Sequence, residues 1–222
     1  YFMRPRERAT PAQAAATGYL NQLAEGWRYA LARQHLRAAV IFAGIGALAG
    51  RSVLETLPIL ANGVFGQGPS GLGYMTAAAG AGAAAASIFK AVSRPQIPGE
   101  FQPQILAMPV IIPLLVAAFA MIGDFATAVA AVALVGGTVT LMSISLQSTV
   151  QMEIEDQYRG RVMGLWTTIS IGSGAAGAVL MGFLVDLVGV APAQLMIGLV
   201  LAAASILVLL RFRRGLSQPD AR

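Results

Sequence analysis

Two opposite charges, Arg51 and Glu55, lie inside a long apolar stretch of the chain. Their spacing of four residues places them on one face of a helix, where they can form an ion pair. An ionised side chain within a bilayer costs at least about 2.5–3.5 kcal/mol on insertion scales, so such residues usually serve a function. We expect this face to line a translocation cavity, with Glu55 as a candidate proton carrier and Arg51 as its charge partner. A fixed ion pair that only holds the helix to its neighbours is an equally good interpretation.

Uncharged polar positions could line the same cavity. Pro58 follows Glu55 by three residues, and because proline lacks an N–H it frees a carbonyl one turn back and favours a bend. A later apolar stretch carries four further candidates for the cavity wall, Thr138, Thr140, Ser143 and Gln147. Their side chains either bind a substrate or form hydrogen bonds between helices, which are worth about 0.6–2 kcal/mol each.

A short segment between two apolar stretches carries charges of both signs. These charges are Glu153, Glu155, Asp156, Arg159 and Arg161. A loop with both signs can exchange salt bridges, so we expect it to form a cytoplasmic gate. The alternative is a solvated surface loop, in which exposed ion pairs contribute only about 0–1 kcal/mol.

Small residues mark a further stretch as a packing surface. Gly172, Gly174, Gly177 and Gly182 fall within one apolar block. Glycines at helical spacing let two backbones approach closely in lipid, so we expect these four to pack against other helices.

Catalytic and metal chemistry find little support in the composition. The sequence holds no cysteine and one histidine, which excludes a zinc site of the Cys or Cys/His type and a cysteine nucleophile. No glycine-rich nucleotide motif and no Ser/His/Asp arrangement is present. We therefore expect no enzyme, no catalytic residues, no metal and no cofactor.

The elements that position these residues are expected to be membrane helices. Of the 222 residues, 56% are hydrophobic and 11% are charged, whereas soluble domains have about 45–50% and about 25%. Six continuous apolar blocks are long enough to cross a bilayer. They lie at Ala38 to Val64, Leu72 to Val92, Ile105 to Gly123, Ala126 to Val150, Val162 to Val185, and Ala191 to Leu210. The sequence predicts an all-α, polytopic bundle of six transmembrane helices.

The basic residues predict how this bundle is oriented. Fourteen of the 15 lysines and arginines flank the ends of the blocks that lie on one side, and Arg51 is the remaining one. The positive-inside rule then places both termini in the cytoplasm of a multi-pass cell-membrane protein. We expect a basic amphipathic lead-in over residues 1–37, the bundle over 38–211 and a cytoplasmic tail over 212–222, with no nucleic-acid partner. Because the chain begins at Tyr1 rather than Met, we expect a fragment or a processed product.

Several motifs together resemble the C-terminal half of a major facilitator superfamily transporter. They are the basic lead-in from Leu23 to Arg37, R-S-V-L-E-T-L-P from Arg51 to Pro58, D-Q-Y-R-G-R-V-M-G from Asp156 to Gly164, and G-F-L-V-D-L-V-G from Gly182 to Gly189. The chain is most similar to the bacterial exporter branch that includes enterobactin-exporter-like and transmembrane secretion effector proteins. The loop F-K-A-V-S-R-P-Q-I-P-G departs from the G-x-x-x-D-R-x-G pattern that many members carry there.

The resemblance implies a fold and a function. Members have twelve helices in two halves, bind substrate between the halves and rock one half against the other. The first and fourth helices here would line the cavity, and the second and fifth would face the other half. The implied partners are the lipid bilayer, a small-molecule substrate and an N-terminal six-helix half from the same chain or another copy. We expect proton-coupled export (proton antiport) of small amphipathic molecules across the cell inner membrane; a non-transporting scaffold or assembly partner is the alternative.

Overall fold

The computed structural model describes residues 27–29, 31–93 and 103–216, and every regular element in this part is a helix. The elements are α3 (Gln34–Ile59), η1 (Leu60–Val64), α4 (Gly68–Val92), α5 (Pro103–Phe119), α6 (Phe125–Glu153), α7 (Arg159–Val188) and α8 (Val190–Leu216). The predicted lead-in before Trp27 and the loop over residues 94–102 lie outside the described residues.

The predicted all-α polytopic bundle is confirmed. Five of the described helices are long and apolar enough to cross a membrane, and α5 is a shorter apolar helix. The predicted ends of the apolar blocks differ from the observed ends of the helices mainly at two places. The third block was expected to run to Gly123, but α5 ends at Phe119, because the apolar residues after it form a turn. The last block was expected to end at Leu210, but α8 continues to Leu216.

The first span changes its winding where proline was expected to bend it. Pro58 lies inside α3, and the helix continues as the π-helical segment η1. The N–H of Phe65 reaches back five residues and donates to the carbonyl oxygen of Leu60 at 2.9 Å. A π-helical turn accommodates an interruption of the regular hydrogen-bond ladder, and such turns are frequent at functional sites. The end of α3 is therefore locally wider than a regular α-helix.

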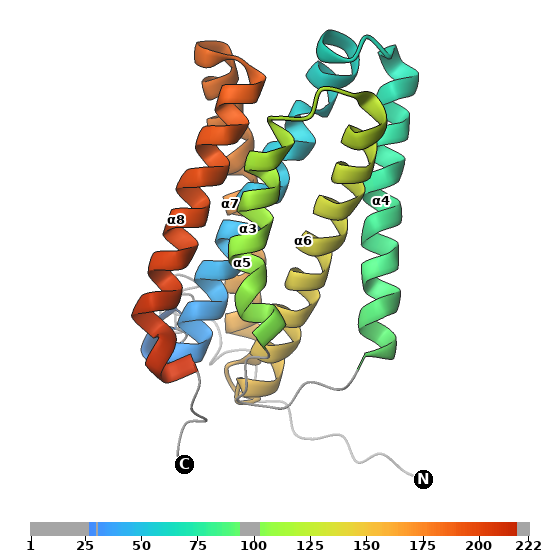
Figure 1. Ribbon diagram of the computed structural model, residues 1–222. Coiled ribbons are helices and arrows are strands. Elements are labelled where there is room, and N and C mark those ends of the chain that lie inside the picture. Colours follow the sequence, from blue (N-terminus) through green and yellow to red (C-terminus); the bar gives the residue numbers. More distant parts are fainter. Residues whose placement is uncertain (1–26, 30, 94–102, 217–222) are drawn as a thin grey trace, which may run out of the picture.

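Helix pairing relates the first three helices to the last three. The closest pairs are α4 with α6, α3 with α7, and α5 with α8. Exchanging α3, α4 and α5 for α6, α7 and α8 converts the first pair into the second and leaves the third unchanged. This is the pattern expected of two inverted three-helix repeats. Figure 1 shows α4 and α8 at opposite sides of the bundle, with α3 and α6 between them.

Glycines allow the backbones of these pairs to touch. A Cβ on Gly136 of α6 would lie 2.5 Å from the carbonyl oxygen of Ala79 in α4. A Cβ on Gly177 of α7 would lie 2.8 Å from the carbonyl oxygen of Leu48 in α3. Close approach of this kind replaces the hydrophobic effect as the source of helix association in lipid.

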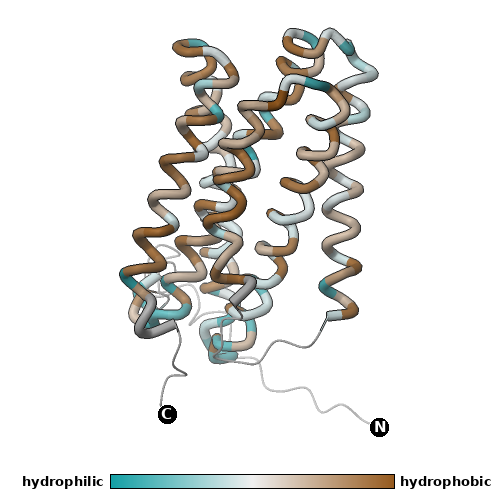
Figure 2. Tube along the Cα trace, in the orientation of Figure 1, coloured by the Kyte–Doolittle hydropathy of each residue, from teal (hydrophilic) through white to brown (hydrophobic). Residues whose placement is uncertain are grey.

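The distribution of polarity fits a lipid environment. Buried positions include Ser52, Thr56 and Gln194, whereas Phe89 and Leu207 are largely exposed. Hydrophilic residues gather at the helix ends, and the lengths of the helices are mostly hydrophobic (Figure 2). The beginning of α3 and the end of α8 lie at the same end of the bundle, and we call this the arginine-rich end because Arg33, Arg37, Arg159 and Arg211 lie there.

Candidate functional site

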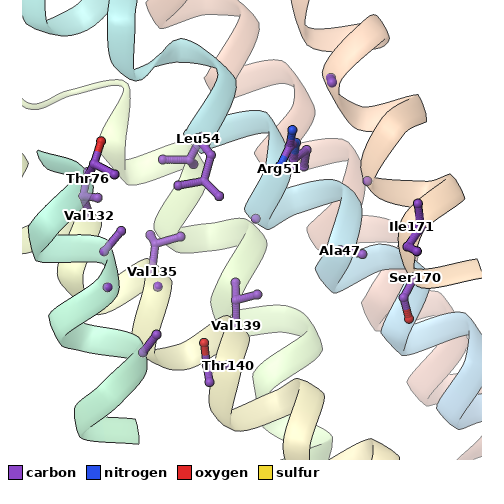
Figure 3. A pocket seen from close by; sticks show the side chains of 18 of the residues that line it. Ala47, Arg51, Leu54, Thr76, Val132, Val135, Val139, Thr140, Ser170 and Ile171 are labelled. Carbon is purple, nitrogen blue, oxygen red and sulfur yellow. The ribbon is translucent and has the colours of Figure 1, made fainter. Parts of the chain in front are cut away.

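A groove opens along one side of the bundle, between α4 and α7. Its volume is about 910 Å³, within the range of about 300–1,000 Å³ that is common for small-molecule sites. Its walls come from α3, α4, α6 and α7, and α4 and α7 are not among the pairs that pack closely. Most of the lining is small or aliphatic, as Val132, Val135 and Val139 illustrate (Figure 3). The groove therefore offers an apolar surface that could hold an apolar molecule.

Arg51 gives this apolar groove its charge. It lines the groove from α3, and among the described lining residues it is the only charged one. Its Nε lies 2.7 Å from Oε1 of Glu55, and the two side chains are 53% and 39% exposed. The predicted i to i+4 ion pair is thus present. Glu55 is outside the set of residues that line the groove, so the arginine is the member of the pair that faces it.

The other predicted cavity residues are distributed unevenly. Thr140 lines the groove, as do the hydroxyl residues Thr76 and Ser170. Thr138 does not; its hydroxyl donates to the carbonyl oxygen of Leu134 at 2.8 Å within its own helix. Pro58, Ser143 and Gln147 also lie outside the groove lining. The structure therefore brings together Arg51 and Thr140 from the predicted set, and leaves the other polar candidates elsewhere on their helices.

The four predicted packing glycines of α7 have different surroundings. Gly177 meets the α3 backbone, as described above. A Cβ on Gly174 would lie 3.9 Å from Cγ of Arg51, so this glycine borders the arginine's aliphatic stem. A Cβ on Gly172 or on Gly182 would meet no described atom within 4 Å outside the neighbouring turns of its own helix. No close packing of these two glycines against another helix is found among the described residues.

A cluster of aromatic and charged side chains joins two distant segments at the arginine-rich end. We call it the clasp, and it consists of Tyr29, Arg33, Glu155 and Tyr158. The rings of Tyr29 and Tyr158 stack with centroids 4.3 Å apart, and the guanidinium of Arg33 lies 4.6 Å from the Tyr29 centroid. Nη2 of Arg33 pairs with Oε1 of Glu155 at 2.5 Å. The clasp ties the segment before α3 to the connection between α6 and α7.

Hydrogen bonds define the charge state of the clasp. Nε2 of Gln157 donates to Oε2 of Glu155 at 3.1 Å, and the tyrosine hydroxyl of Tyr29 lies 3.5 Å from Oε1. The hydrogen bond from Gln157, followed by that from Arg33, lowers the pKa of the Glu155 carboxyl. Because these donors stabilise the carboxylate, Glu155 is charged at neutral pH.

The remaining predicted gate charges lie around the clasp. Asp156, in the turn before α7, pairs with Arg159 at 3.1 Å. The backbone carbonyl of Glu153 accepts a hydrogen bond from Arg33 at 3.4 Å. Arg161 is in the first turns of α7, because that helix begins at Arg159. The predicted loop is therefore shorter than expected, because Glu153 belongs to α6 and Arg159 and Arg161 belong to α7.

Several residues of the site had no signal strong enough to find them in the sequence. Tyr29 and Tyr158 are separated by more than half the chain, and no spacing rule connects two such aromatics. The buried Gln194 of α8, which donates to the hydroxyl of Thr56 in α3 at 2.8 Å, was also missed. A glutamine in an apolar block is the one hint the sequence gives, since a polar group at membrane depth needs a partner.

Comparison with known proteins identifies the family. A family model described as transmembrane secretion effector matches residues 2–220. No curated protein and no solved structure matches the chain. The match covers nearly the whole sequence and agrees with the apolar helices of the fold. The chain therefore belongs to the transmembrane secretion effector family, and it is a multi-pass membrane transporter of the major facilitator type.

Proposed function

We propose that this chain is the C-terminal half of a secondary active transporter that exports small amphipathic molecules in exchange for protons. The groove between α4 and α7 is the observation that carries the proposal. It is open along one side, its walls are apolar, and Arg51 lies in it. A second six-helix half placed against α4 and α7 would close the groove into a central cavity.

In this proposal the Arg51–Glu55 pair is the coupling element. An ion pair at membrane depth is stable only while both members are charged, since an unpaired charge there is costly. Protonation of Glu55 would release Arg51, and loss of the proton would restore the pair at 2.7 Å. The two states differ in the charge that the groove presents, which is what a proton-driven cycle requires.

The clasp completes the proposal as a cytoplasmic gate with both termini on the cytoplasmic side. Alternating access needs contacts at one end of the bundle that break and re-form. Salt bridges at an exposed site meet that need because each contributes little, about 0–1 kcal/mol. Gating contacts of Arg159 and Arg161 with a second half belong to the same proposal.

The test is proton-driven flux in liposomes that contain the full-length transporter. The neutral substitution Glu55→Gln should abolish flux that depends on an imposed pH gradient, because the side chain can no longer gain and lose a proton. Counterflow, which exchanges substrate across the membrane without an imposed pH gradient, should persist in the same variant. Asp186→Asn, which removes an exposed carboxylate near the end of α7, is the matched control and should leave flux unchanged.

Two results would contradict the proposal. Gradient-driven flux that is unchanged in Glu55→Gln would remove Glu55 from the mechanism. A wild-type protein that shows neither flux nor counterflow with any amphipathic substrate would favour the scaffold interpretation of the six-helix bundle.

A further inference from the structure

We propose that the groove selects amphipathic molecules that carry an anionic group, and that the guanidinium of Arg51 binds that group. This inference rests on the transport function proposed above, and it specifies the substrate class of the same site. Three features of the groove lead to it: the sign of its charge, the geometry of the arginine and the apolar character of the remaining wall.

The charge on the groove surface is positive. Arg51 is the only charged residue among the described residues that line it, and its partner Glu55 is not part of the lining. Thr76, Thr140 and Ser170 add hydroxyl groups but no charge. A ligand in the groove therefore meets a cation before it meets the carboxylate. An anion is attracted to this surface, and a cation is repelled from it.

The arginine can bind an anion without leaving its own partner. The contact with Glu55 is made by Nε, at the base of the guanidinium. The two terminal nitrogens carry four of the five N–H donors. That planar fork matches the oxygens of a carboxylate, a sulfonate or a phosphate. The side chain is 53% exposed, so an anion in the groove can reach the fork.

A glycine of α7 borders the arginine stem. A Cβ on Gly174 would lie 3.9 Å from Cγ and 4.0 Å from Cβ of Arg51. A larger side chain at position 174 would occupy the space between the stem and α7. Gly174 therefore leaves space beside the stem, and in Figure 3 the Arg51 side chain lies between α3 and α7.

The rest of the wall fits an apolar body. Val135 and Val139 of α6, Leu54 of α3, and Ile171 and Val179 of α7 all line the groove. Burial of apolar surface against these side chains favours a hydrocarbon or an aromatic ring system. One anionic group attached to such a body satisfies both parts of the groove, whereas a small inorganic anion would leave the apolar wall empty.

Glu55 acts in this inference as an internal competitor. Its carboxylate partly neutralises Arg51 through the 2.7 Å contact. Removing the negative charge by Glu55→Gln should therefore strengthen binding of an anion. Arg51→Gln should weaken it, and Arg51→Lys, which keeps the charge but not the planar fork, should give an intermediate affinity.

Equilibrium binding of three fluorescent probes tests the inference in the full-length protein in lipid nanodiscs. The probes share one dansyl ring system and differ in charge: dansylglycine is an anion, its amide is neutral and dansylcadaverine is a cation. Wild type should bind dansylglycine about tenfold more tightly than the neutral amide, and Arg51→Gln should remove that preference. Arg211→Gln, which removes an exposed arginine at the end of α8 outside the groove, is the matched control.

The outcomes separate this inference from the transport proposal. Equal binding of the anion and the cation by wild type would overturn the anion site, whether or not the protein shows flux. A preference for the anion that Arg51→Gln removes and Arg211→Gln keeps would support the site, even if no gradient-driven flux is found. If Arg51→Gln fails to fold, the opposite variant decides: weaker binding of dansylglycine by Glu55→Gln would overturn the inference, and tighter binding would support it.

Discussion

At the scale of single residues, a buried polar pair fixes the position of α8 against α3. Nε2 of Gln194 donates to Oγ1 of Thr56 at 2.8 Å, and both side chains are 1% exposed. The Thr56 hydroxyl also donates to the carbonyl oxygen of Val53 at 2.7 Å. Each of the two buried side chains thus has a hydrogen-bond partner, which is what a polar group needs in order to stabilise a bundle in lipid.

Gln194→Leu should destabilise the protein by about 0.6–2 kcal/mol, because it breaks the contact between the helices and keeps the volume of the side chain. A double-mutant cycle with Thr56→Val, measured by reversible unfolding in mixed micelles, isolates the pairwise part. Additive effects of the two substitutions would contradict a direct interaction.

A second residue, Asp124, controls the start of α6. Its carboxylate accepts a hydrogen bond from the N–H of Thr127 at 2.8 Å, and this bond is the main reason that the pKa of Asp124 is lowered. The cap satisfies one of the free N–H groups at the helix start.

Asp124→Ala should therefore increase amide hydrogen exchange in the first turn of α6 and lower the thermal stability, whereas Asp124→Asn, which retains an acceptor oxygen, should lie close to wild type. The group contributes stability that is present above its unfolded pKa and lost as the pH falls through its lowered folded pKa. Equal exchange rates in the alanine variant and wild type would show that the cap does not hold the turn.

At the scale of helices, contacts between backbones decide which helices are neighbours. A Cβ on Gly82 of α4 would lie 1.9 Å from the carbonyl oxygen of Ala133 in α6. Gly73 lies in the same helix, and a Cβ there would meet no described atom within 4 Å outside the neighbouring turns of that helix. The two glycines differ in what surrounds them and share the same helical context, so they form a matched pair.

Gly82→Ala should destabilise the bundle by about 1–3 kcal/mol through overpacking against the α6 backbone. Gly73→Ala should be neutral or slightly stabilising, since alanine has the higher helix propensity. Thermal unfolding of both variants in the same detergent provides the comparison. Equal stability of the two variants would mean that α4 and α6 separate at no cost.

The extent to which helices could be predicted depends on the signal that each one leaves in the sequence. Continuous apolar length gives the spans, because the bilayer sets a minimum of about 20 residues. Apolar length does not predict where the helices end. Met121 and Ile122 are as apolar as the helix before them, yet α5 ends at Phe119. The ion pair of Arg51 and Glu55 was predictable, since both residues belong to one helix and their spacing determines the contact. A cavity that includes Arg51 and Thr140 was also predicted, but the rest of its wall was not, because that wall is assembled from four helices whose lining residues are individually ordinary.

At the scale of the whole molecule, the clasp joins the segment before α3 to the connection between α6 and α7. Its acid–base behaviour follows from Glu155. Hydrogen bonds from Gln157 and Arg33 lower the pKa of this carboxyl, so the contribution of the clasp is present above the ordinary glutamate value and is lost as the pH falls through the lowered one.

Acidification through the lowered pKa of Glu155, below the ordinary glutamate range, should therefore open the clasp. Trp27, two residues before Tyr29, is 45% exposed and can report on it in a Trp166→Phe background. Acrylamide quenching of Trp27 should rise as the pH falls in the parent protein. In Arg33→Gln it should be high and nearly independent of pH; a quenching profile with the parent's pH dependence would show that Arg33 does not hold the clasp.

The crossed pairing of helices also has a consequence during synthesis. The α7 residues that pack on α3 lie roughly 130 positions after their partners, as Gly177 does after Leu48. At about 5–20 residues per second the ribosome needs roughly 6–26 seconds to reach them. During that interval the first span waits in the membrane without its main partner. Glu55 is already present one turn from Arg51, so the guanidinium has a charge partner from the moment the helix forms. The ion pair thus allows a helix with an internal arginine to remain inserted in the membrane before α7 is available to pack against it.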